Sequence, residues 1–192
     1  MNEFAKPPIE PMKISLDISS GSLTPSGPML TRKLSDLDGC FLNTKKFQSD
    51  VTSRNPIVYE VISSLVPEVA RELPQSITTI YPGSCGGELY MTKGHQHPDP
   101  QGEIYYGLEG TGGIILFDGK ISKWIEITPG KIGYIPPAWA HRSVNTGSTK
   151  YKFLAVYPGS AGHDYGWVLK NGMGYRAFSE NGKLILKDFV IL

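Results

Sequence analysis

The sequence predicts an all-β protein, an antiparallel barrel or sandwich with a few short helices. From Asn55 onward, short runs rich in Ile, Val, Tyr and Thr follow one another, and these residue types favour strands. Gly, Pro and Asn-Gly turns separate the runs at intervals of about 8 to 12 residues. No helical pattern lies between the runs, which favours antiparallel pairing because parallel strands need long crossover connections.

The chain is expected to contain one domain preceded by an arm. Residues 1–30 carry five prolines and no sustained periodicity, so we expect an extended arm that wraps on the body of the protein or on a second subunit. Residues 31–192 are expected to form a single domain, because 192 residues is an ordinary length for one domain with a full core.

Helix signals are few, and strand signals fill the rest of the chain. Ser35 is expected to cap a short turn that Gly39 ends, and Asn43 or Thr44 to cap another. The expected strands cover residues 12–18, 56–66, 76–82, 87–97, 103–110, 112–118, 121–128, 131–137, 142–147, 151–158, 166–171, 174–180 and 183–192.

Composition and charge exclude several classes of function. The formal net charge is +1, without a block of like charges, so we expect neither nucleic acid nor an anionic membrane as a partner. No segment approaches the roughly 18 apolar residues of a membrane span, and the N-terminus lacks the apolar core of a signal peptide. We therefore expect a cytoplasmic protein in which Cys40 and Cys85 are reduced.

A cluster of metal-ligand residue types lies in the middle of the sequence. His95 and His97 stand at i and i+2, so on a strand their side chains point to the same face. Residues 98–102 carry two prolines and a glycine and predict a turn, which would fold Glu103 back beside the histidines as a hairpin. His141 follows a Pro-Pro bend and is a fourth candidate. Three imidazoles and one carboxylate suit Fe(II), Mn(II), Ni(II), Zn(II) or Cu(II).

The distribution of histidine supports this hypothesis over its alternative. Of the four histidines, three lie in these motifs, and the fourth, His163, lies in a Gly-rich loop after an apolar strand. The alternative is that His95 and His97 are ordinary surface or core residues, because short motifs also match by chance. Histidines placed for packing would not be expected to concentrate in this way.

The two segments resemble the two motifs of the cupin family. The matching positions are His95, His97, Glu103 and Gly110 in the first motif, and Gly130, Pro136, His141 and Asn145 in the second. The sequence departs from the motifs at two places. The spacer between His97 and Glu103 is five residues, one or two longer than in most cupins, which could shift Glu103 within the coordination sphere. Ala138 stands where the motif has Gly, which we expect only to tighten a turn.

The flanking sequence is similar to the cupin-type, archaeal-like glucose-6-phosphate isomerases. The segments that carry the resemblance are RKLSDLDGCF, IVYEV, TTIYPG, TKGHQH, PPAWAHRSVN and AVYPGSAGHDYG, which together extend over about residues 30–170. The resemblance implies a cupin β-barrel or jelly roll that interconverts glucose 6-phosphate and fructose 6-phosphate on a divalent metal. That metal is usually Fe(2+), with Mn(2+), Ni(2+) or Zn(2+) tolerated, and its ligands here would be His95, His97, Glu103 and His141.

The resemblance also implies roles for residues around the metal. The phosphate would be held by Thr78, Thr92, Gly94 and Tyr157, with Lys93 as an added charge. Residues near the reacting carbons would be Glu103, Tyr59, Tyr105, His163 and Tyr165. For each threonine and tyrosine the alternative is ordinary strand packing, because these types are enriched in strands and cores. His163 is favoured as functional because loops on a rigid barrel commonly carry function.

The chemistry leaves two routes open. An aldose–ketose exchange moves a hydrogen between C1 and C2, and a Lewis-acidic metal stabilises the charge that develops on the oxygens of these carbons. In proton transfer, Glu103 is the nearest base, although metal binding weakens it. In a hydride shift, Glu103 is only a ligand.

Two other classes of function remain open at this stage, together with the oligomeric state. The same four ligands would serve another metal-dependent cupin enzyme, such as a dioxygenase or a sugar epimerase, or a non-catalytic sugar-binding cupin. We expect a homodimer, because the arm and the terminal strand 183–192 leave edges that a second copy could cover.

Overall fold

The computed structural model describes residues 9–189, and within them strands dominate. The strands are β1 (Ser15–Asp17), β2 (Ser22–Thr24), β3 (Met29–Lys33), β4 (Ile57–Ser63), β5 (Gln75–Ile80), β6 (Ser84–Cys85), β7 (Glu88–Leu89), β8 (Glu103–Glu109), β9 (Gly112–Phe117), β10 (Ser122–Glu126), β11 (Ile132–Ile135), β12 (Ala140–Asn145), β13 (Tyr151–Val156), β14 (Gly174–Glu180) and β15 (Lys183–Phe189). The helices are the 3-10 helix η1 (Leu34–Leu37) and the α-helices α1 (Thr44–Ser53) and α2 (Tyr165–Asn171).

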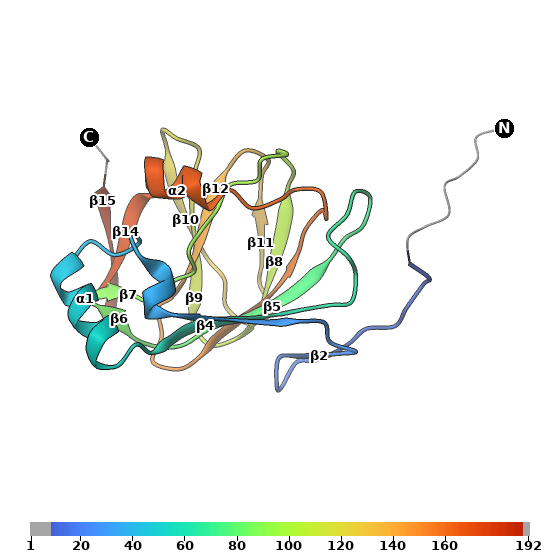
Figure 1. Cartoon of the computed structure of the whole chain (residues 1–192), viewed down its shortest axis with the longest axis horizontal. Coiled ribbons are helices and arrows are strands. Elements are labelled where there is room, and N and C mark those ends of the chain that lie inside the picture. Colours follow the sequence, from blue (N-terminus) through green and yellow to red (C-terminus); the bar gives the residue numbers. More distant parts are fainter. Residues whose placement is uncertain (1–8, 190–192) are drawn as a thin grey trace.

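Two sheets of strands form the two layers of the barrel. One is a six-stranded sheet in the order β11-β8-β13-β5-β4-β3, and the other contains β10-β9-β12. The segment before His97 extends the second layer, because single bridges join Met91 to Val144 and His95 to His141. Every pairing between named strands is antiparallel. The predicted all-β antiparallel fold is confirmed, and Figure 1 shows the layers closing around one interior.

The core lies between the two layers and forms the floor of the pocket described below. On β13 the inward residues Tyr151, Phe153 and Ala155 alternate with partly exposed ones, the period expected of a strand with one buried face. Phe153 stacks on Tyr105 of β8 with ring centroids 4.5 Å apart. Burial of a side chain of this size contributes about 1.5–3 kcal/mol. The ring pair therefore fixes both strands beneath the site.

The helices differ in part from the prediction. The expected strand over residues 166–171 is wrong, because this segment is helix α2. The Asp164 side chain accepts a hydrogen bond from the backbone N–H of Trp167 at 3.0 Å, and the helix ends at Gly172, whose φ is +73°. These end signals outweigh the strand propensity of the residues between them.

The two earlier helices match the prediction only in part. Asn43 caps α1 by accepting from the N–H of Lys46 at 2.9 Å, as one of the two expected caps. Ser35 does not cap η1. That turn begins after Lys33, whose N–H donates to the Asp36 carboxylate at 2.8 Å. None of the helices in the described part of the chain is long and apolar enough to cross a membrane.

The N-terminal segment contains more strand than expected. Besides β1, which lies in the predicted strand 12–18, residues of β2 and β3 pair as well: β2 with β1, and β3 with β4 at the edge of the large sheet. Residues 1–8 of the expected arm, and the last three residues of the expected strand 183–192, lie outside the described residues. Cys40 and Cys85 are both buried and free.

Candidate metal centre and its pocket

The four candidate ligands reach one point from both layers of the barrel. Two backbone hydrogen bonds join His95 to His141 at the start of β12, with N–O distances of 3.1 and 2.9 Å. Glu103 is the first residue of β8, which pairs with β11 and β13 and not with the histidine segment. The expected hairpin is therefore wrong. Most of the expected strand 87–97 is also replaced by isolated bridges, which join Met91 and His95 to β12 and Gln96 to Asp164.

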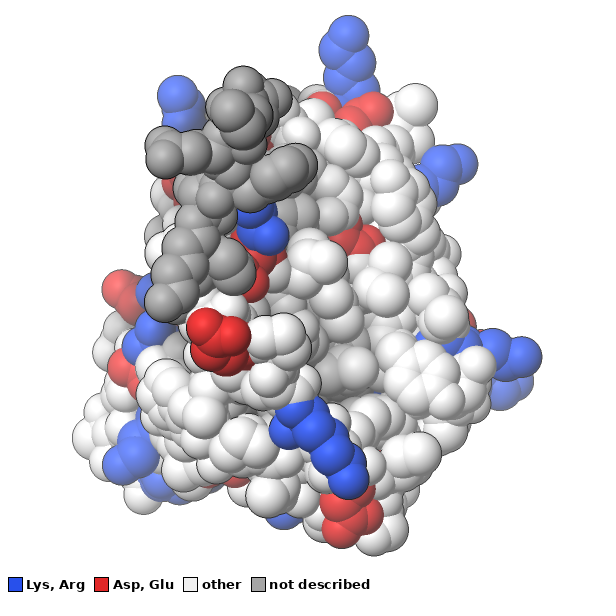
Figure 2. Space-filling view, turned by 90° about the vertical axis from the view of Figure 1, so that its right-hand side faces the viewer, with Lys and Arg blue, Asp and Glu red and all other residues white. Residues whose placement is uncertain are grey.

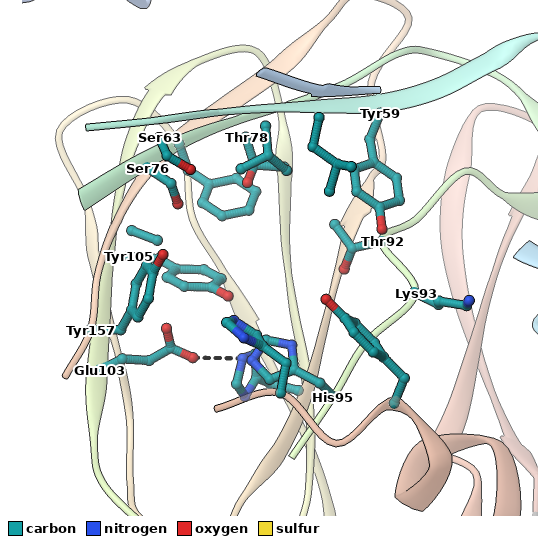
Figure 3. A pocket seen from close by; sticks show the side chains of 18 of the residues that line it. Tyr59, Ser63, Ser76, Thr78, Thr92, Lys93, His95, Glu103, Tyr105 and Tyr157 are labelled. Carbon is teal, nitrogen blue, oxygen red and sulfur yellow. Dashed lines mark ion pairs between the residues drawn. The ribbon is translucent and has the colours of Figure 1, made fainter. Parts of the chain in front are cut away.

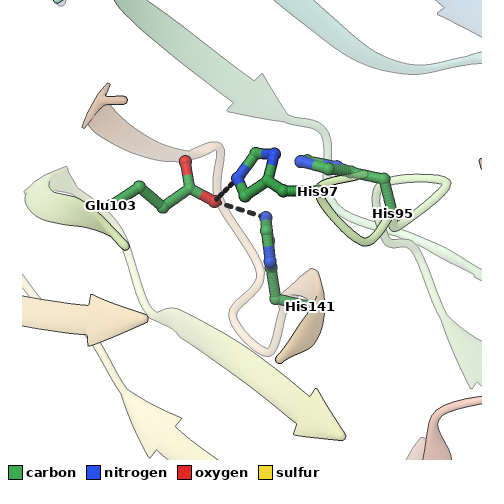
Figure 4. A group of neighbouring side chains, drawn as sticks. All are labelled: His95, His97, Glu103 and His141. Carbon is green, nitrogen blue, oxygen red and sulfur yellow. Dashed lines mark hydrogen bonds and ion pairs between the residues drawn. The ribbon is translucent and has the colours of Figure 1, made fainter. Parts of the chain in front are cut away.

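The side chains converge closely enough for a single ion to lie between them. One ligand atom from each of His95, His97, Glu103 and His141 lies within 4.8 Å of the others. Glu103 Oε1 is 2.6 Å from His141 Nε2 and 3.2 Å from His97 Nε2, as Figure 4 shows. The longer spacer before Glu103 does not take its carboxylate out of the cluster.

Backbone carbonyls orient two of the imidazoles. His97 Nδ1 lies 2.7 Å from the carbonyl oxygen of Gly162, and His141 Nδ1 lies 3.3 Å from that of Trp139. An imidazole that donates from Nδ1 presents a lone pair on Nε2. The Nε2 atom of His95 is buried and has no hydrogen-bond partner among the described residues. A bound cation would satisfy these nitrogens, so the residues present fit a divalent metal.

The electrostatics of the cluster agree with this fit. Burial lowers the pKa of His95 well below its usual value, and the neighbouring histidines act in the same direction. Burial alone would also raise the pKa of Glu103, but His141 and His97 lower it to about 2. Burial opposes the charging of His97, yet the Glu103 carboxylate raises its pKa. The centre thus holds one carboxylate among imidazoles.

A cavity of about 250 Å³ opens directly beside the ligands (Figure 3). Its lining includes every residue that sequence reasoning proposed for catalysis or phosphate binding: Tyr59, Thr78, Thr92, Lys93, Gly94, Glu103, Tyr105, Tyr157, His163 and Tyr165. Figure 3 shows Tyr105 and Tyr157 on the side of Glu103, and Tyr59 and Thr92 on the opposite side. The structure therefore brings the proposed residues together, and His97 belongs to the metal cluster without lining the cavity.

Several lining residues were not singled out from the sequence. They are Leu30, Val61, Ser63, Glu68, Ser76, Phe153 and Ala155. Ser63 and Ser76 face each other across β4 and β5, and each resembles an ordinary strand residue in the sequence. Glu68 lies in the loop between these strands, where no local pattern indicates function. Only the three-dimensional pairing reveals these residues.

The hydroxyls in the pocket are predominantly protonated donors at neutral pH. Burial raises the pKa of Tyr59 to about 12 and that of Tyr105 well above its usual value. Burial also raises the pKa of Tyr157, whose hydroxyl donates to the Glu68 carboxylate at 2.7 Å. The ring of His163 lies 4.4 Å from that of His95, centroid to centroid, and burial lowers its pKa.

Charged side chains on one face of the molecule are dispersed. Figure 2 shows Lys and Arg side chains scattered over the face that it views, without one basic patch. Polar side chains also line the inside of the pocket. There Thr92 Oγ1 accepts from the N–H of Ser143 at 3.0 Å, which leaves the hydroxyl proton of Thr92 free to donate.

The fold and the site define the class of protein, and comparison with known proteins defines the family. An antiparallel barrel that holds three histidines and a glutamate at one end of its pocket is the arrangement of a metal-binding cupin. The chain belongs to the glucose-6-phosphate isomerase family, whose model, described as Glucose-6-phosphate isomerase (GPI), matches residues 31–189. The resemblance stated from the sequence is confirmed.

Curated relatives cover nearly the whole chain. The glucose-6-phosphate isomerase of Thermococcus litoralis is 40% identical over 182 residues, covering 93% of this chain and 95% of its own length. That of Pyrococcus abyssi is likewise 40% identical with the same coverage. Among solved structures, oxalate decarboxylase from Bacillus subtilis has a TM-score of 0.41 and 21% identity, over 52% of this chain and 26% of its own.

Proposed function

We propose that this chain is a metal-dependent aldose–ketose isomerase that interconverts glucose 6-phosphate and fructose 6-phosphate. The observation that carries the proposal is the convergence of His95, His97, Glu103 and His141 beside a cavity of about 250 Å³. Membership of the glucose-6-phosphate isomerase family supports the choice of reaction. The cavity volume of about 250 Å³ lies just below the usual range of ligand pockets, so we expect a single small ligand.

The proposed cofactor is Fe(2+), with Mn(2+), Ni(2+) or Zn(2+) as substitutes. Imidazole and carboxylate ligands suit this group of divalent ions. The ion would supply electrostatic stabilisation of the charge that develops on the sugar oxygens at C1 and C2. The four side chains would hold it from both layers of the barrel, so the ion's position relative to the pocket is set by the fold.

The remaining residues would position the open-chain sugar and move its hydroxyl protons. Tyr105 and Tyr59 present hydroxyl groups that are predominantly protonated at neutral pH, so they would act as hydrogen-bond donors. His163 and Tyr165 stack with ring centroids 6.1 Å apart at one side of the cavity and would carry protons between the sugar hydroxyls. Phe153 lines the cavity and would present an apolar ring that limits water near the reacting carbons.

The phosphate group would lie near Thr78, Thr92, Lys93 and Gly94. Thr92 supports this placement because its hydroxyl oxygen already accepts from Ser143, which directs its proton elsewhere. Tyr157 can join only by exchanging its bond to Glu68 for one to phosphate, since a hydroxyl donates a single proton.

A coupled assay of fructose 6-phosphate conversion tests the proposal. The purified protein is stripped with a chelator and reloaded with one metal at a time; we expect activity to disappear and return with Fe(2+). Glu103→Ala should lose at least about a hundredfold in kcat/KM, because it removes both a ligand and the nearest base. The matched control is Glu109→Ala at the other end of β8, which loses only a surface ion pair with Lys152 and should retain activity.

The two alternatives give different results in the same preparation. Oxygen consumption without conversion of fructose 6-phosphate would indicate a dioxygenase. Tight binding of the sugar phosphate without turnover would indicate a non-catalytic sugar-binding protein. Full turnover by the Glu103→Ala variant with its metal retained would contradict the role assigned to Glu103.

A further inference from the structure

We propose that Arg142 is a positioning residue for the anionic end of the substrate, because it holds the Lys93–Gly94 peptide with the Gly94 N–H facing the pocket. The proposal rests on the proposed function, since it assumes that an anionic group enters this part of the cavity. The Arg142 side chain does not line the cavity and is not one of the four candidate metal ligands.

Arg142 is a buried cation whose contacts are directed at one peptide group. Its exposed fraction is 5%. Its Nη2 and Nε atoms both donate to the carbonyl oxygen of Lys93, at 2.7 and 3.3 Å. Within residues 9–189 no carboxylate forms an ion pair with it. A buried guanidinium is costly to keep without a charged partner, so its position calls for an explanation.

The geometry of a trans peptide transmits this contact to the pocket. The carbonyl of Lys93 and the N–H of Gly94 belong to one planar group and point in opposite directions. Because the carbonyl points to Arg142, the N–H points away from it. His141 faces the cavity, and the next residue on β12 faces the opposite side of the strand. The Gly94 N–H is therefore directed toward the cavity that Gly94 lines.

That N–H group is available to a ligand. Among the described residues, the N–H of Gly94 has no backbone or side-chain acceptor. The N–H groups of Thr92 and His95, by contrast, donate to the carbonyls of Ser143 and His141 on β12. A buried donor without a partner is rare and calls for a ligand or a water. An anionic oxygen would accept from this group together with the free hydroxyl proton of Thr92.

Glycine is favoured at position 94, where Arg142 lies close behind the backbone. Its φ is +75°, and an added Cβ would lie 3.1 Å from both Cβ and Nε of Arg142 and from the carbonyl oxygen of His141. The two residues therefore depend on each other. Arg142 holds the Lys93–Gly94 peptide by its hydrogen bonds to the Lys93 carbonyl, and the missing side chain of Gly94 leaves room for Arg142. The buried positive charge behind the peptide also favours an anion in front of it.

Lys93 does not provide the same charge in the same place. Figure 3 shows its side chain extending to one side of the cavity. Its Nζ lies 5.7 Å from the centroid of the Tyr165 ring. The cation that is fixed behind the Lys93–Gly94 peptide is Arg142.

The test measures phosphate binding by the metal-loaded enzyme. In Arg142→Lys we expect KM for fructose 6-phosphate and the inhibition constant of inorganic phosphate to rise together by about tenfold, with kcat within about threefold, because a lysine cannot reproduce the two-donor contact. The matched control is Arg176→Lys, an arginine that contacts the Cys40 carbonyl and Glu88 and should leave both constants unchanged. An unchanged inhibition constant in Arg142→Lys would overturn the proposal.

A measurement on the wild-type protein keeps the proposal testable if the variant does not fold. In the zinc-loaded protein, inorganic phosphate should shift the amide resonance of Gly94 more than the paired amides of Thr92 and His95. If the Gly94 resonance does not move while phosphate inhibits, the proposal is wrong. Failure of the wild-type enzyme to convert fructose 6-phosphate, with the Gly94 shift present, would instead contradict the proposed function alone.

Discussion

Among single residues, Ala138 occupies a backbone conformation that suits glycine. Its φ is +67°, in the left-handed region. Its carbonyl accepts from the side chain of Gln96, the residue between His95 and His97, at 2.9 Å. The turn before β12 therefore touches the first ligand segment. An alanine in this region costs about 1–2 kcal/mol relative to right-handed backbone, so the departure from the cupin motif does more than tighten a turn.

We expect Ala138→Gly to stabilise the protein. Relief of the left-handed strain exceeds the added entropy of the unfolded chain, which leaves a gain of about 0.5–1 kcal/mol in the free energy of unfolding. Urea denaturation measures this difference. Ala70→Gly is the control, because Ala70 is also exposed but has no positive φ, and it should lower stability slightly. A loss of stability in Ala138→Gly would show that the turn is not strained.

At the scale of elements, the start of α2 connects His163, in the preceding loop, to Tyr165, the first residue of the helix. The Asp164 side chain caps the helix, and its backbone exchanges two hydrogen bonds with Gln96, at 3.2 and 2.8 Å. One residue thus ties the helix to the segment between two ligands. The position of the helix therefore determines how the rings of His163 and Tyr165, on either side of Asp164, face the cavity.

We expect Asp164→Ala to affect both stability and activity. Loss of the cap should cost about 1 kcal/mol, measured by urea denaturation, and should lower kcat/KM because the helix start no longer fixes the neighbouring rings. Asp164→Asn is the matched control, since asparagine caps helices equally well. If the alanine variant kept wild-type stability while the asparagine variant lost it, the side chain would not act as a cap.

The elements also show what the sequence could and could not reveal. Strands such as β8 and β13 were predictable because their alternation and their turns are local signals. Helix α2 was missed because its apolar composition resembles a strand, and its two end signals decide the outcome. The sequence pattern around His95 predicts a regular strand of a hairpin, whereas in the structure this segment pairs with the distant β12 only by single bridges.

The same distinction applies to the site. The ligand set was predictable because two of its histidines, His95 and His97, lie two residues apart on one segment and the motifs resemble a known family. Glu68 and Arg142 were not, because their importance depends on contacts with Tyr157 and Lys93 that no sequence pattern encodes. Residues that position other groups are therefore found by structure rather than by motif.

At the scale of the whole molecule, the candidate metal centre connects parts of the chain that are far apart. His95 and His97 come from the segment beside β12, Glu103 begins β8 in the opposite layer, and His141 belongs to β12. A bound ion would therefore join both layers of the barrel. The expected homodimer stays a prediction, which sedimentation of the purified protein would test.

Because an ion that binds the folded but not the unfolded chain stabilises the fold by mass action, metal should raise the melting temperature of the whole domain. At free metal about a hundredfold above the dissociation constant, the gain is about 2.7 kcal/mol, and calorimetry of chelated and reloaded protein measures the shift. In His141→Ala this metal-dependent shift should be largely lost. In His163→Ala it should persist, because His163 lies beside the cluster without belonging to it. Loss of the shift in both variants would mean that His163 is a ligand and that the four-residue assignment is wrong.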